Sequence, residues 1–139
     1  MINIENDVFS AVAGKLRTEY SGITVDSSFI SDPGKFPYVS VVEADNRIHQ
    51  RMRTVKIENA VEVMYEVNVL SNRSSGKKTE AKAIADTVDT EFEKLGFTRT
   101  MREQIPNYLD ASVFRLVMRY EAVVGPGIDT GTYLVYQNY

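Results

Sequence analysis

The stretch that decides the fold is AVEVMYEVNVL, residues 60–70, in which apolar and polar side chains alternate almost without interruption. Its apolar face carries Val61, Val63, Tyr65, Val67 and Val69, and its second face carries Glu62, Met64, Glu66, Asn68 and Leu70. A period of two is the signature of a β-strand. Residues 111–124 alternate in the same way, with Arg115, Arg119 and Glu121 on the polar face. Such alternation favours an antiparallel sheet that is covered by helices on one face and wet on the other.

Two segments instead have helical spacing. Between residues 4 and 20 the apolar side chains recur every fourth position, and Gly22 is the expected stop. A second stripe predicts a helix after the turn at residues 71–76, with Ser74 or Ser75 as N-cap and Gly96 as the C-terminal stop. Its members are Ala81, Ile84, Ala85, Val88, Phe92 and Leu95.

Three further strands are expected at residues 23–30, 36–44 and 97–103, so the predicted order is α-β-β-β-α-β-β. We therefore predict an α+β fold, an antiparallel sheet with two helices packed on one face, in a single domain of residues 1–124. Gly125-Pro126-Gly127 then breaks the pattern, and residues 125–139 are predicted to form a C-terminal arm.

Composition excludes several classes of function. The 139 residues contain no cysteine, which removes disulfides, thiolate metal sites and a cysteine nucleophile. No apolar run approaches the roughly 20 residues that span a bilayer, and the N-terminus lacks the pattern of a secretion signal. We expect a cytoplasmic protein without a membrane partner. The net charge of −3 disfavours a domain-wide nucleic-acid binder.

The sequence contains no complete catalytic motif. Gly76-Lys77-Lys78-Thr79 has the end of a phosphate loop, but Ser71 stands where that motif needs its first glycine. His49 is the single histidine, and the carboxylates Asp86, Asp89 and Glu93 are typical of the solvated face of a helix. We predict no catalytic, cofactor or metal site, and a protein that is not an enzyme.

Two segments instead suggest contact with partners. Residues 45–58 hold four formal cations and two acids, a net charge of +2 that leaves −5 for the remaining residues. The candidate contact residues of this loop are Arg47, His49, Arg51, Arg53 and Lys56. The alternatives for so long a loop are partner contact, a solvated surface and disorder.

The arm is the second such segment, with contact residues Tyr133, Leu134, Val135, Tyr136 and Tyr139. So many apolar side chains are wasteful on an isolated chain, and an extended arm can add to the sheet edge of a neighbour. Met64 and Leu70 on the wet face could likewise be covered by another subunit.

A succession of short motifs carries a family resemblance. They are Phe-Pro-Tyr-Val (36–39), Glu-Asn (58–59), Val-Met-Tyr-Glu-Val-Asn-Val (63–69), Gly-Lys-Lys-Thr-Glu-Ala-Lys (76–82), Gly-Phe-Thr-Arg (96–99), Ile-Pro-Asn (105–107) and Phe-Arg-Leu-Val-Met-Arg-Tyr (114–120). In this order the sequence resembles the tail-terminator, or tail-completion, proteins of long-tailed bacteriophages over most of residues 1–124.

The resemblance implies a structural subunit of a homo-oligomeric ring, commonly a hexamer, that caps the tail tube and supports head-tail joining. The implied partners are other copies of the chain, the tail tube protein and the head-tail connector or neck proteins, with DNA passing through the lumen without specific binding. The implied location is the virion tail or neck, after assembly in the host cytoplasm. The alternatives are another phage neck, connector or tube component, and a nucleic-acid-binding module that uses residues 45–58.

Overall fold

The computed structural model describes residues 4–30, 33–48, 61–106, 111–126 and 133–136 of the chain. Two helices and six strands follow one another in the order α1 (Glu5–Glu19), β1 (Thr24–Asp26), β2 (Tyr38–Ile48), β3 (Val61–Ser71), α2 (Lys77–Lys94), β4 (Thr98–Gln104), β5 (Phe114–Pro126) and β6 (Tyr133–Tyr136). The predicted α+β class and the order α-β-β-β-α-β-β are confirmed over α1 to β5.

The strands form one sheet in the order β1-β2-β3-β5-β4, and β6 pairs with β5. Strands β2, β3, β5 and β4 pair in antiparallel fashion, but β1 lies parallel to β2. The sheet is therefore mixed, and the expectation of a wholly antiparallel sheet is wrong at β1. The physical reason is the connection of eleven residues between Asp26 and Tyr38, which lets the chain cross over instead of turning back in a hairpin.

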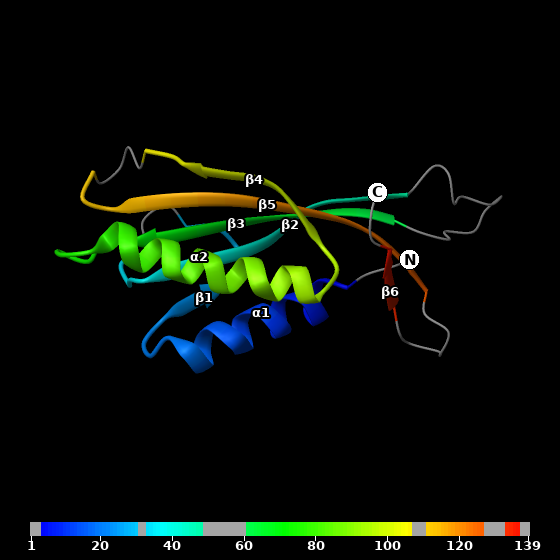
Figure 1. Cartoon of the computed structure of the whole chain (residues 1–139), viewed down its shortest axis with the longest axis horizontal. Helices are drawn as coiled ribbons and strands as arrows, with labels where there is room; N and C mark the ends of the chain where they lie inside the picture. The colour runs from blue at the N-terminus through cyan, green and yellow to red at the C-terminus, as the bar shows by residue number, and fades with distance from the viewer. Residues whose placement is uncertain (1–3, 31–32, 49–60, 107–110, 127–132, 137–139) are drawn as a thin grey trace.

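Both helices lie side by side on one face of the sheet, as predicted (Figure 1). The apolar stripes of the helices and the apolar faces of β3 and β5 meet in a single core. Val12, Leu16, Ile84 and Phe92 are fully enclosed there. The spacing of the apolar residues along each helix and strand thus predicted which side chains are buried.

Four aromatic rings form the centre of this core. Phe92 of α2 stacks on Tyr120 of β5 with ring centroids 4.2 Å apart and planes 4° apart. Its edges meet Phe97 at 5.3 Å and Tyr65 at 5.8 Å. Burial raises the pKa of the Tyr65 and Tyr120 hydroxyls, so both stay neutral at physiological pH.

The acidic side of α2 has a structural explanation. Asp86 pairs with Arg102 of β4 at 2.9 Å, and Asp89 pairs with Arg99 at 3.2 Å. The Tyr120 hydroxyl also donates to the Asp89 carboxylate at 3.0 Å. These carboxylates tie the helix to the edge strand β4.

Several predicted boundaries need correction. Strand β1 is only Thr24–Asp26, and β2 begins two residues later than predicted and continues to Ile48, through a register shift between Glu43 and Asp45. Helix α2 has Gly76 at its N-cap, in a left-handed conformation, and no side chain caps it, so the assignment to Ser74 or Ser75 is wrong. The stop at Gly96 is confirmed, because its φ of 89° is a conformation that glycine adopts at little cost.

The face of the sheet opposite the helices, here called the open face, is covered at one end by the β1–β2 connection. The hydroxyl of the buried Tyr38 donates to the Ser28 carbonyl at 2.7 Å, which holds the connection in place. Leu70 and Val113 pack with Tyr38 in a small second cluster. Leu70 is therefore covered by its own chain, and the expectation that another subunit covers it is wrong.

Candidate assembly surface

The two predicted contact segments start from the same end of the sheet. Ile48, the last residue of β2, pairs with Val61, the first residue of β3. Val61 pairs in turn with Val124 of β5, and Val124 pairs with Val135 of β6. These four backbone positions form one row across the sheet, so the end of β2 and the start of β3 lie where the arm strand is attached (Figure 1).

Arg47 is the loop candidate that the structure describes, and it belongs to strand β2. Its Nε donates to Glu62 at 2.6 Å, and a terminal nitrogen donates to Asp45 at 3.0 Å. The bond to Glu62 raises the pKa of Arg47 further above its ordinary value. Arg47 is still 61% exposed. The other loop candidates, His49, Arg51, Arg53 and Lys56, lie outside the described residues.

The sequence predicted a loop from residue 45, and this is corrected by the structure because the strand continues. Between Glu43 and Asp45 one extra residue, Ala44, is inserted, and the pairing with β3 then resumes. A bulge of this kind turns the following side chains to the other face of the sheet. It places Asp45 and Arg47 opposite Met64 and Glu62, on the open face.

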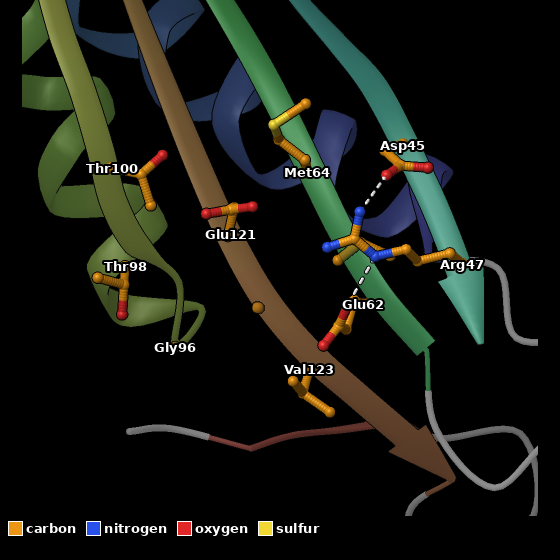
Figure 2. A pocket seen from close by; sticks show the side chains of 11 residues that line it. Asp45, Arg47, Glu62, Met64, Gly96, Thr98, Thr100, Glu121 and Val123 are labelled. Atoms are coloured by element: carbon orange, nitrogen blue, oxygen red, sulfur yellow. Dashed lines mark hydrogen bonds and ion pairs between the residues drawn. The ribbon is translucent and has the colours of Figure 1, made fainter. Parts of the chain in front are cut away.

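A hollow of about 180 Å³ opens beside Arg47, on the side of the sheet away from the helices (Figure 2). Three carboxylates line it, from Asp45, Glu62 and Glu121, and Arg47 is the single cation among the described lining residues. The remaining lining residues are apolar or small: Val63, Met64, Gly96, Thr98, Thr100, Ala122 and Val123. The hollow is thus acidic at its rim and partly apolar, a combination that suits a cationic and apolar protein partner better than a nucleic acid.

The arm candidates Tyr133, Leu134, Val135 and Tyr136 form strand β6, which pairs with residues 123–126 at the end of β5. Because the other edge of β5 is taken by β3, β6 lies on the same edge as β4. Tyr139 lies outside the described residues. The arm strand in this structure therefore extends the sheet of its own chain.

Sequence reasoning missed the hollow. Glu121 and Val123 were visible on one face of a predicted strand, but the hollow needs β3, β5 and β4 as neighbours in that order. Nothing local specifies that order. The β-bulge that presents Asp45 was equally hidden, because alternation is lost there without a glycine or proline to mark it.

Within the described part of the chain, no three His, Cys, Asp or Glu side chains gather in a way that could hold a metal ion. No helix of the described residues is long and apolar enough to cross a membrane. Comparison with protein-family models and with curated proteins finds no match for this sequence.

Proposed function

We propose that this chain is a structural subunit of a phage tail terminator, which assembles into a ring of six copies that caps the tail tube and supports head-tail joining. It acts by assembly and not by turnover. Its partners in this proposal are other copies of itself, the tail tube protein and the head-tail connector.

One observation carries the proposal: the bases of the basic loop and of the arm meet in one row of the sheet. A loop of this length inside a compact domain is usually either functional or disordered, and the proposal takes the first alternative. Two contact segments attached at one end of the two-layer domain would give a contact surface that is separate from the helical layer. The family resemblance supplies the class of assembly, since its motifs run from strand β2 through strand β5.

The arrangement also suits a ring on physical grounds. A closed ring needs two different surfaces on each copy, which meet head to tail. The loop-and-arm end offers backbone for strand addition and a basic segment, and the rest of the chain carries the compensating negative charge.

Electron microscopy of particles assembled without this protein tests the proposal. Tail tubes of uncontrolled length, or finished tails that fail to join heads, are the expected result. Complete absence of tubes would instead assign the chain to the tube itself, and normal infectious particles would refute a role in the tail.

A further inference from the structure

Phe29 and Ile30, here called the knob, are exposed at the covered end of the open face. They are the large hydrophobic side chains that remain exposed among the described residues, at 37% and 46%. The Ile30 backbone N-H donates to the Tyr38 hydroxyl at 3.2 Å, so the backbone of the knob is held to a buried side chain. An exposed apolar pair that is fixed in place is a common mark of a protein contact.

A cation accompanies the knob. The Arg115 guanidinium lies 4.6 Å from the centre of the Phe29 ring, within the range of a cation-π contact. Its Nε donates to Asn68 at 2.9 Å, which fixes the guanidinium on the open face. The knob therefore presents apolar surface next to a positive charge.

The hollow has the complementary chemistry. Met64 supplies half-buried apolar surface, the buried Val123 lines the hollow, and Glu121 supplies an exposed carboxylate beside Glu62 and Asp45. Arg47 is already bound to Asp45 and Glu62. Among the described lining residues the three carboxylates therefore outnumber the cation. A cavity of about 150 Å³ is sufficient to bind benzene, so the hollow has room for a phenyl ring.

The two features lie on the same face at opposite ends. Arg115 and Glu121 are six residues apart on β5, which is roughly 20 Å at the rise of a strand. A two-fold axis between the two open faces, parallel to the sheets and perpendicular to the strands, would put the knob of each copy over the hollow of the other. Such a contact is isologous and stops at two copies.

We propose that two copies of this chain associate through their open faces, antiparallel, with Phe29 and Ile30 of each copy in the hollow of the other. The residues halfway between knob and hollow are compatible with this arrangement. Glu66 and Arg119 pair with each other there at 3.1 Å and are partly exposed. The two-fold axis brings each of them over its own counterpart, and because the pair is neutral as a whole, the centre of the contact carries no net charge.

The available area sets the strength of the association. The contact region of the open face, from knob to hollow, is about eight residues long and four strands wide. At the usual spacings of a sheet its area is roughly 500 Å² per copy. A standard protein interface buries about 800 Å² per partner. The dimer is therefore weak and depends on concentration. The proposed dimer is independent of the proposed ring, because the contact between knob and hollow does not require a phage tail.

Sedimentation of the full chain over a range of concentrations tests the proposal, with three variants. Phe29→Ser with Ile30→Ser removes the knob, and Glu121→Lys reverses the charge of the hollow. Glu93→Lys makes the same charge change on the exposed side of α2, far from the open face, and is the control. Circular dichroism confirms that each variant is folded, as expected for exposed positions.

The wild type and Glu93→Lys should form a dimer as the first associated species, and the knob and hollow variants should dimerise about tenfold or more weakly. An equimolar mixture of the knob and hollow variants should associate more tightly than either alone, because one intact knob then meets one intact hollow. A wild-type chain that stays monomeric at every concentration, or variants that dimerise as tightly as the wild type, would overturn the proposal.

Discussion

Replacing Phe92 by alanine is the sharpest test of the core. The side chain is fully buried and touches three other aromatic rings, one of them in parallel stacking at 4.2 Å. Truncating a buried phenylalanine costs about 3 to 5 kcal/mol of unfolding free energy. An aromatic pair adds about 0.5 to 1.5 kcal/mol beyond area burial, so we expect a loss near the top of that range. This is a large fraction of the roughly 5 to 15 kcal/mol that stabilises a domain.

Chemical denaturation measures this loss, with two comparison variants. Phe92→Leu keeps most of the volume and removes the stacking on Tyr120, so it should cost only about 1 to 2 kcal/mol. Phe29→Ala removes an exposed ring and should change stability by about 0.5 kcal/mol or less. A loss for Phe92→Ala no larger than that for Phe29→Ala would refute the assignment of the aromatic core.

Three further predictions concern the backbone, a carboxyl group and the loop. Gly96→Ala should lower the unfolding free energy by about 1 to 2 kcal/mol, because φ at this position is 89°. Gly14→Ala lies inside α1 with open space around it and should raise the unfolding free energy by about 0.5 to 1 kcal/mol. Equal effects of the two substitutions in thermal melts would contradict this. Burial, followed by the charge of Glu5, raises the pKa of Glu43 above 4.5; the folded chain then binds the proton more tightly, so stability falls as pH rises from 4.5 through the raised pKa. When the denaturant midpoint is measured against pH, Glu43→Gln should show a smaller decrease over this range than the wild type. Equal decreases in the two proteins would exclude a raised pKa of Glu43 as the cause. The double variant Arg51→Glu with Arg53→Glu should keep its melting temperature but bind tail tubes more weakly in a pull-down. The control Lys78→Glu with Lys82→Glu on α2 should bind tail tubes as the wild type does. Loss of folding in the loop variant would refute a surface role for these arginines.

The parts of the fold that follow from local periodicity were predictable. In α1 and α2 the stripes at helical spacing are the buried residues, and in β3 all five alternating apolar side chains are buried. Each of these patterns depends only on residues within one element. The burial of Phe92 was therefore accessible from spacing alone.

The parts that depend on tertiary neighbours were not. Residues 27–30 have β-branched and aromatic side chains, yet they leave the sheet because Tyr38 holds Ser28 and Ile30 over the open face. The bulge at Ala44 extends β2 into the predicted loop, and the insertion of β5 between β3 and β4 creates the hollow. The knob and the hollow thus arise from packing across the sheet, which sequence pattern does not encode.

The central claim is that copies of this chain close into a ring on the end of a tail tube. The most direct test is the mass of the purified chain measured alone and after mixing with isolated tail tubes, together with images of the tube ends. We predict a closed ring of six copies, bound to one end of each tube. A chain that neither binds the tubes nor assembles in their presence would contradict the account.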